Sequence, residues 1–226
     1  MAVAAVAPAA GRVALVAGAT GLVGQAVLAA LLTDKKYQYS AVLAIGRRQL
    51  REQHPRLVNI RVDFAQLPAL PKVDDVYIAL GTTIKVAGSR EAFRAVDFDA
   101  VLATAKAARL AGATRLGLVS AMGADAKSMV FYSRVKGETE QALAGLGYAT
   151  LVIARPSVLA GNRAAVDQPT RAGELIGLTI SNMLKPVIPA NYRAIQARDV
   201  ARALLDSVAE GRPGQRVLLS GEMQPA

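Results

Sequence analysis

The segment 131–138, FYSRVKGE, contains the side chains of this chain that are best suited to acid–base chemistry. Tyr132 and Lys136 are four positions apart, so on a helix both lie on one face. A free phenol has a pKa of about 10 and exchanges protons poorly near neutral pH, but a neighbouring ammonium stabilises the phenolate and lowers that pKa. A tyrosine and a lysine at this spacing often arise by chance. The pair therefore predicts catalysis only if the surrounding elements bring a redox cofactor to it.

Ser120 precedes the pair, at the end of the apolar run RLGLVS. We expect its hydroxyl to orient or polarise a carbonyl oxygen, which is the task of an electrophilic group in a hydride-transfer site. Tyr132 would protonate the developing alkoxide, and Lys136 would also hydrogen-bond the ribose hydroxyls of a nicotinamide cofactor.

Short apolar runs alternate with helical patterns along the whole chain, which is typical of a parallel sheet covered on both faces. The expected strands are RVALVAG, AVLAIG, VNIRVD, DVYIALG, RLGLVS, YATLVIARP and QRVLLS. The expected helices are 22–32, 90–111, Phe131–Ala144, 174–183 and 199–208. The pattern predicts an α/β fold, a doubly wound parallel sheet (Rossmann fold) in one domain over 1–226. Within it, 1–11 is a loose leader and 161–195 is a small substrate-side insert near the C-terminus.

The turn GATGLVG lies between the first expected strand and the first expected helix. Gly18 permits a tight turn, Gly21 lets the backbone approach a pyrophosphate, and Gly24 lets the helix pack against the strand. The helix N-terminus then offers N–H groups to the phosphates. A merely structural turn is the alternative. The expected cofactor contacts here are Gly18, Ala19, Thr20, Gly21, Leu22, Val23 and Gly24.

The end of the second strand, AIGRRQLRE, favours NADP(H) over NAD(H). Arg47 and Arg48 stand where an NAD-dependent protein usually has a carboxylate for the ribose 2′-hydroxyl. A guanidinium binds a 2′-phosphate with two hydrogen bonds. The alternative is a solvated basic loop, and we assign Arg51 and Arg56 to that role.

Two further turns follow strands that would border the cofactor. After the third strand, Asp63 and Phe64 would contact the adenine, although a helix N-cap and a core phenylalanine explain the same residues. The turn after the fourth strand contributes Leu80, Gly81, Thr82 and Thr83 beside the middle of the cofactor. Small residues and hydroxyls also suit any ordinary turn.

The composition of the 226 residues excludes several classes of function. Cysteine is absent, which excludes disulfides and thiolate sites, and the single histidine, His54, lies in a polar stretch. No metal site is therefore expected. The formal charge of +10 allows an anionic partner, but the basic residues are scattered and aromatic residues are 4%. Nucleic-acid binding is accordingly the weakest reading. No signal sequence or membrane helix is recognisable, so we expect a cytoplasmic protein.

Taken together, the motifs resemble one known protein family. Gly-x-x-Gly-x-x-Gly, a serine and Tyr-x-x-x-Lys, in this order, are similar to the extended or atypical short-chain dehydrogenase/reductase superfamily. IGRRQL, LGTT, FRAVDFDAVLATAKAARLAGATRLGLVSAMGAD, YSRVKGETE and RPSVLAG resemble its Tat-interacting-protein branch, and the likeness extends over about 12–199. The resemblance implies a Rossmann fold, NADP(H), Tyr132 and Lys136 at the catalytic positions, and a helix-mediated homodimer. It also implies that Pro156, Ser157 and Val158 lie beside the nicotinamide.

The chain departs from this family at two positions. Relatives often have consecutive hydroxyl residues at the end of the fifth strand, whereas here Ala121 follows Ser120. The serine can therefore sit one position from the catalytic place. Ser157 stands where relatives often have glycine.

Three functions remain open on these residues. The first is an NADP(H)-dependent oxidoreductase acting on a small carbonyl or alcohol, such as a sugar derivative or a quinone. The second is a noncatalytic NADP(H)-binding regulator, and an enzyme similar to nucleoside-diphosphate-sugar epimerases is a related alternative. The third is a nucleic-acid binder. Residues that could line a small substrate site, or equally lie at the surface, are Arg163, Asn182, Tyr192 and Arg193.

Overall fold

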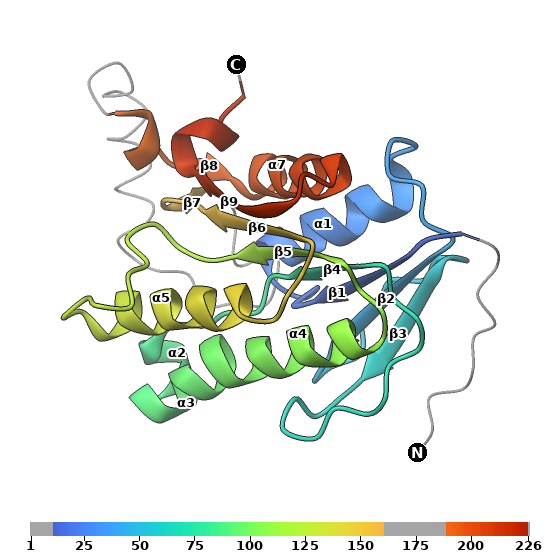
Figure 1. Ribbon diagram of the computed structural model, residues 1–226, viewed down its shortest axis with the longest axis horizontal. Coiled ribbons are helices and arrows are strands. Elements are labelled where there is room, and N and C mark those ends of the chain that lie inside the picture. Colours follow the sequence, from blue (N-terminus) through green and yellow to red (C-terminus); the bar gives the residue numbers. More distant parts are fainter. Residues whose placement is uncertain (1–10, 161–188, 226) are drawn as a thin grey trace.

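A computed structural model describes residues 11–160 and 189–225. A central sheet of seven parallel strands has the order β3-β2-β1-β4-β5-β6-β9 (Figure 1). The strands are β1 (Val13–Ala17), β2 (Ala41–Gly46), β3 (Leu57–Arg61), β4 (Asp75–Ile78), β5 (Arg115–Val119), β6 (Thr150–Arg155) and β9 (Gly214–Leu219). Helices cover both faces, so the predicted Rossmann fold is confirmed.

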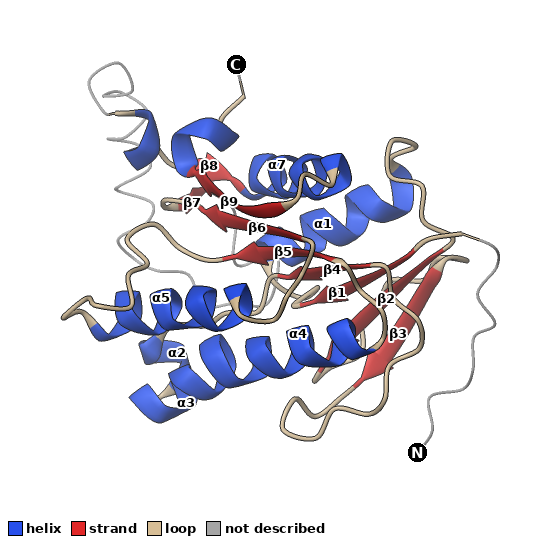
Figure 2. Cartoon of the chain, in the orientation of Figure 1, coloured by secondary structure: helices blue, strands red, loops and turns tan. Residues whose placement is uncertain are grey.

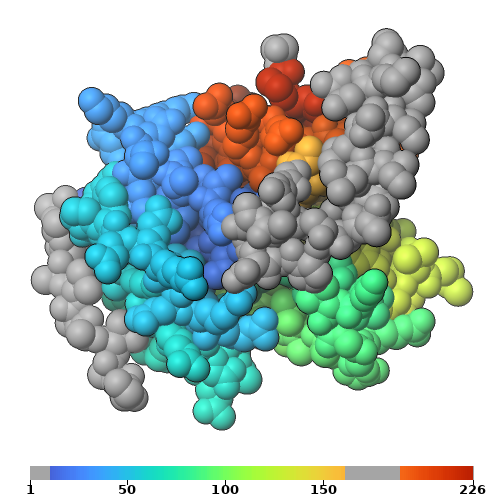
Figure 3. All heavy atoms as spheres, turned by 180° about the vertical axis from the view of Figure 1, so that it is seen from behind, coloured from blue at the N-terminus to red at the C-terminus, as the bar shows by residue number. Residues whose placement is uncertain are grey.

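The helices form one layer on each side of the sheet (Figure 2). The upper layer in this view consists of α1 (Leu22–Thr33) and α7 (Ala197–Glu210). The lower layer consists of α2 (Ile84–Ala87), α3 (Arg90–Arg94), a π-helical segment (Ala95–Ala100), α4 (Val101–Leu110) and α5 (Phe131–Ala144). Seen from behind, α1 (blue) lies against α7 (orange) (Figure 3). The helix expected over 90–111 is thus present, but it contains a π-helical interruption.

The buried first strand shows why these apolar runs become inner strands of a parallel sheet. Successive side chains of a strand point to opposite faces. One core cluster contains residues of α4 together with Val13, Leu15 and Ala17. The other contains residues of α1 and α7 together with Ala14 and Val16. Both faces are covered, so an uninterrupted apolar run is required.

The order of the strands reverses between β1 and β4. β1 and β4 are neighbours, and the strands that follow each of them extend the sheet in opposite directions. In such sheets, ligands bind at the carboxyl ends of the strands, at this point of reversal. The turn after β1, the turn after β4 and the start of α5 all lie at this edge.

The C-terminal part adds a small second sheet. β7 (Leu159–Ala160) pairs in parallel with β8 (Ile195–Gln196), and a 3-10 turn (Ala190–Tyr192) precedes β8. Of the predicted features, most of the leader, most of the insert, the helix over 174–183, Arg163 and Asn182 lie outside the described residues. Among the described residues, no helix is both long and apolar enough to cross a membrane.

Candidate active site

The three glycines of the turn after β1 differ in the space around them: two have no room for a Cβ atom, and the third does. Gly18 has φ +90°, and a Cβ there would lie 2.4 Å from the carbonyl oxygen of Ala79, after β4. A Cβ on Gly24 would lie 2.0 Å from the carbonyl oxygen of Gly18. Gly21, in contrast, would meet its nearest atom at 3.5 Å, an ordinary contact. The fold therefore needs Gly18 and Gly24, while nothing in the packing requires Gly21.

The N-terminus of α1 is prepared for an anion. Gly21 is its N-cap, no side chain caps it, and no acidic residue lies in its first turn. Unpaired N–H groups and the positive end of the helix dipole therefore face the crevice. The flanking residues Ala19 and Val23 are buried, and Thr20 and Leu22 are half-buried.

The two arginines after β2 are exposed, as a phosphate site requires. Neither Arg47 nor Arg48 forms an ion pair with any residue that the structure describes. Because β2 is adjacent to β1, both follow a strand that ends at the same edge as the glycine turn. Asp63 and Phe64 also have local contacts. The Asp63 carboxylate accepts the N–H of Ala65 at 3.0 Å, and Phe64 packs against the core.

The helix α5 brings the tyrosine and lysine to this edge. Tyr132 is half-buried in its first turn, with its ring 5.4 Å from that of Phe93 between centroids. Lys136, one turn later, is 6% exposed. Its Nζ would lie 3.6 Å from a Cβ on Gly81, so the ammonium sits against the loop that follows β4. The structure thus brings the helix with the tyrosine and lysine together with the loop expected beside the cofactor.

A residue that the sequence did not single out, Asp97, completes this arrangement. Its side chain has no exposed surface, and its Oδ1 lies 2.8 Å from Lys136 Nζ. Its Oδ2 accepts the N–H of Thr82 at 2.9 Å. Burial alone would lower the pKa of Lys136, but the charges of Asp97 and of the Tyr132 phenolate oppose it, and the net direction is upward. Asp97 lies four residues from the buried Phe93 and Val101, a helical spacing that distinguishes it from the exposed Asp99.

Ser120 has a different partner from the expected one. Its hydroxyl is buried and donates to Glu140 Oε1 at 2.5 Å, about two helical turns beyond Tyr132 on α5. Glu140 also accepts from Arg155 Nε at 3.1 Å and from Arg155 Nη2 at 2.5 Å. In the structure, Ser120 therefore joins the ends of β5 and β6 to α5.

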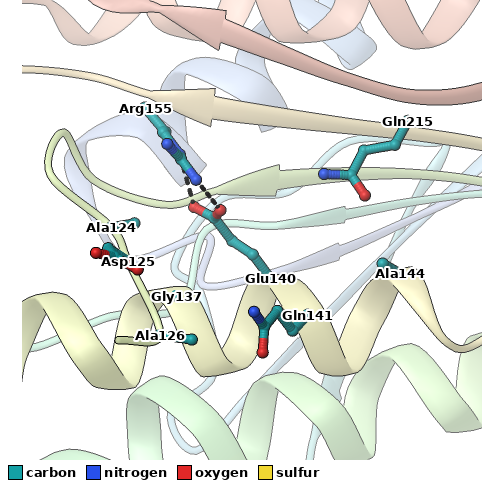
Figure 4. Close-up of a pocket in the computed structure, with 9 residues that line it drawn as sticks. All are labelled: Ala124, Asp125, Ala126, Gly137, Glu140, Gln141, Ala144, Arg155 and Gln215. Atoms are coloured by element: carbon teal, nitrogen blue, oxygen red, sulfur yellow. Dashed lines mark hydrogen bonds and ion pairs between the residues drawn. The ribbon is translucent and has the colours of Figure 1, made fainter. Parts of the chain in front are cut away.

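This Glu140–Arg155 pair borders a pocket of about 460 Å³ beside α5 (Figure 4). The pocket is lined by Ala124, Asp125, Ala126, Gly137, Glu140, Gln141, Ala144, Arg155 and Gln215. Its two most buried charges are already bonded to each other.

The loop after β6 is fixed beside β5 and β8. The carbonyl of the buried Pro156 accepts the N–H of Met122 at 2.9 Å, and the carbonyl of Val158 accepts the N–H of Ile195 at 3.0 Å. The hydroxyl of Ser157 donates to the carbonyl of Arg193. This backbone role explains a serine at a position where the family often has glycine. Tyr192 is 64% exposed, so it does not line an enclosed site within the described residues.

Comparison with known proteins identifies relatives over nearly the whole chain, although no family model matches. The chain is 33% identical over 212 residues to the protein HTATIP2 of Rattus norvegicus, covering 91% of this chain and 84% of that protein. It is 32% identical over 220 residues to the mitochondrial protein FMP52 of Lodderomyces elongisporus, covering 89% and 88%.

Solved structures show the same fold at low identity. MoeE5 in complex with UDP-glucose and NAD matches with a TM-score of 0.67 and 18% identity, covering 92% of this chain and 75% of that one. The UDP-N-acetylglucosamine 4-epimerase of Methanobrevibacter ruminantium matches with the same TM-score and identity, covering 92% and 76%. Sequence and fold agree: the chain belongs to the atypical short-chain dehydrogenase/reductase family, in the branch that contains HTATIP2 and FMP52.

Proposed function

We propose that this protein is an NADP(H)-dependent oxidoreductase that transfers a hydride to or from a small carbonyl or alcohol. The observation that carries the proposal is the buried ammonium of Lys136 against the loop after β4, with Tyr132 one turn before it on the same helix. Sugar derivatives and quinones are the substrate classes we would screen first.

The residues present fit a phosphorylated dinucleotide. The uncapped start of α1 and the free space at Gly21 suit a pyrophosphate, and the exposed Arg47 and Arg48 suit a 2′-phosphate. MoeE5, a protein of the same fold, binds NAD, which supports a dinucleotide but not the choice of NADP. That choice rests on the two arginines.

The chain's own residues would then move one proton. The bound nicotinamide supplies or accepts the hydride. Tyr132 donates a proton to the oxygen of the substrate in reduction, or removes it in oxidation. The ammonium of Lys136 stabilises the phenolate that remains and is itself kept charged by Asp97.

Substitution of Tyr132 tests this chemistry. In Tyr132→Phe we expect NADPH binding within a few-fold of the parent and turnover reduced by about 10²–10⁴-fold, the usual contribution of a general acid–base group. Calorimetry measures the first quantity, and oxidation of NADPH on a substrate found by screening measures the second. Full turnover by Tyr132→Phe would refute the role of the phenol.

A noncatalytic NADP(H)-binding regulator is the second candidate. It is favoured by Ser120, whose hydroxyl proton is directed to Glu140 rather than to Tyr132. Tight NADPH binding without turnover on broad screens, and a protein partner whose affinity changes with the oxidation state of the cofactor, would support it. An epimerase-like reaction, suggested by the sugar-nucleotide complexes of the fold neighbours, would instead appear as turnover of a nucleotide sugar without net change in NADPH.

Location and partners stay predictions. We expect a homodimer, which sedimentation or light scattering would detect. The relative FMP52 is named mitochondrial, so a cytoplasmic location needs direct imaging. Binding to DNA at low salt is the test of the nucleic-acid reading, and it would have to fall steeply with added salt.

A further inference from the structure

The helical stretch that contains the π-helical segment Ala95–Ala100 turns one of the two acidic residues of this segment toward the protein interior. A π-helical turn inserts an extra residue into a helix, and such turns are frequent at functional sites. Asp97 is completely buried, at four-residue spacing from the buried Phe93 and Val101, and Asp99 is exposed. Burying a carboxylate without a partner destabilises a fold, so the groups that pair with Asp97 indicate why it is buried.

Asp97 joins two parts of the proposed active site. Its Oδ2 accepts the N–H of Thr82, in the loop after β4, at 2.9 Å. Its Oδ1 lies 2.8 Å from Lys136 Nζ on α5 and has no other partner for a hydrogen bond among the described residues. One carboxylate thus links the loop expected at the middle of the cofactor to the helix that carries Tyr132.

We propose that Asp97 is a positioning residue, which keeps Lys136 charged and holds it against the loop after β4. The inference rests on the proposed function and deepens it. Thr139, one turn after Lys136, donates to the backbone carbonyl of Asp97 at 2.9 Å and fixes this part of the π-helical turn on α5.

Three acidic groups surround Lys136, and among them Asp97 has the largest effect on its pKa. Tyr132 and Glu140 face it from α5, and Asp97 faces it from the π-helical segment. Glu140 is already neutralised by Arg155. Burial lowers the pKa of Lys136, whereas Asp97 raises it, and the net direction is upward. Without Asp97 the effect of burial is opposed only by the weaker effects of Tyr132 and Glu140, so Lys136 would lose its proton at a lower pH.

The test compares Asp97→Asn with Asp99→Asn, the same change on an exposed position of the same segment. Turnover and the Kd for NADPH would be measured from about pH 6 to pH 10. In Asp97→Asn we expect the alkaline loss of turnover and of NADPH affinity to move down by about one to three pH units, as expected when an opposite charge is removed at contact distance. Asp99→Asn should follow the parent protein.

A second measurement does not depend on turnover. Lys136→Met leaves Asp97 buried without its cation, so K136M should unfold at a lower urea concentration than the parent. The double variant K136M/D97N removes both charges and should recover part of that loss. A merely structural role of Asp97 would make the double variant less stable than K136M.

The outcomes separate the two proposals. If the parent protein binds no NADPH and turns over no substrate, the proposed function is wrong. If the parent is active but Asp97→Asn keeps the pH profile of Asp99→Asn, or if K136M/D97N is no more stable than K136M, only the role of Asp97 is wrong.

Discussion

At the scale of single residues, the glycines of the turn after β1 differ in whether their surroundings leave room for a Cβ atom. Gly18 and Gly24 are in contact with backbone that cannot withdraw, because the end of β1, the end of β4 and the start of α1 meet there. Gly21 lies between them without such a neighbour. Two glycines of the motif are therefore needed for packing, whereas Gly21 leaves space for a ligand. Substitutions can distinguish these two roles.

Alanine at these glycines should affect different properties. We expect Gly24→Ala to lower the free energy of unfolding by about 1–3 kcal/mol, since a Cβ there overlaps the carbonyl of Gly18. Gly21→Ala should keep the stability but weaken NADPH binding, because its methyl would occupy the space offered to the pyrophosphate. Urea unfolding and calorimetry measure the two effects. Gly145→Ala, where the nearest atom to a Cβ is 3.6 Å away, is the control.

The arginine that follows β2 should decide between the two coenzymes. In Arg47→Glu we expect the affinity for NADPH to fall by about 10–100-fold, the value of a lost charge-assisted hydrogen bond, with little change for NADH. Arg51→Glu, another exposed arginine of this loop, should change neither. Equal weakening of both coenzymes in Arg47→Glu would contradict contact with a 2′-phosphate.

At the scale of elements, α5 connects the chemistry to the sheet. Tyr132, Lys136 and Glu140 follow one another along it at four-residue spacing, and Glu140 holds Ser120 at the end of β5 and Arg155 at the end of β6. These bonds fix the helix relative to the carboxyl edge of the sheet. They also give the buried Glu140 a structural role on α5, separate from the roles proposed for Tyr132 and Lys136.

Neutralising two glutamates of α5 should have unequal effects. Glu140→Gln removes the charge that pairs with Arg155, and we expect it to lower the free energy of unfolding by about 2–3 kcal/mol. Glu138→Gln removes a partly exposed pair with Arg94, worth less than about 1 kcal/mol. Urea unfolding at neutral pH compares them. Equal losses would mean that the buried pair does not anchor the helix.

At the scale of the whole molecule, a second polar network lies at the opposite edge of the sheet from the site. Asp75, the first residue of β4, is fully buried and is bonded by Arg12, Tyr39 and Arg115. The phenol of Tyr39 also lies 3.0 Å from that of Tyr77. This network joins β1, β4 and β5 at their amino ends, away from the proposed active site.

Three buried phenols and one half-buried phenol predict how the protein responds to alkali. Burial is the largest cause that raises the pKa of Tyr37, Tyr39, Tyr77 and Tyr148, and each phenol would have to lose contacts to ionise. An acid whose pKa is raised by folding stabilises the folded state fully below the unfolded pKa, about 10 for tyrosine, and loses that contribution as the pH rises further. Stability should therefore fall above about pH 10.

Ultraviolet absorbance of tyrosinate and circular dichroism, followed together, measure this effect. We expect most of the tyrosinate signal to appear only as the helical signal is lost. Ionisation of all six tyrosines with the helices intact would contradict the burial of these phenols.

The sequence by itself determined the local and periodic features of this protein. The apolar runs predicted the parallel strands, the glycine spacing predicted the turn after β1, and helical spacing predicted the bounds Phe131–Ala144 of α5. These features depend on neighbouring residues, so a single chain reveals them. The expected roles of Arg47, Arg48 and Tyr132 came from types and positions in the same way, and they remain to be tested.

The tertiary structure decided which distant groups share their charges and protons. The inward position of Asp97 follows the helical spacing of its buried neighbours, but its partners, Lys136 and the N–H of Thr82, lie on other elements. The bond from Ser120 to Glu140 joins residues far apart in the chain, and the sequence gives no sign of it. Such pairings are selected by the cost of burying an unpaired polar group, and this cost arises only when the packed elements exclude water.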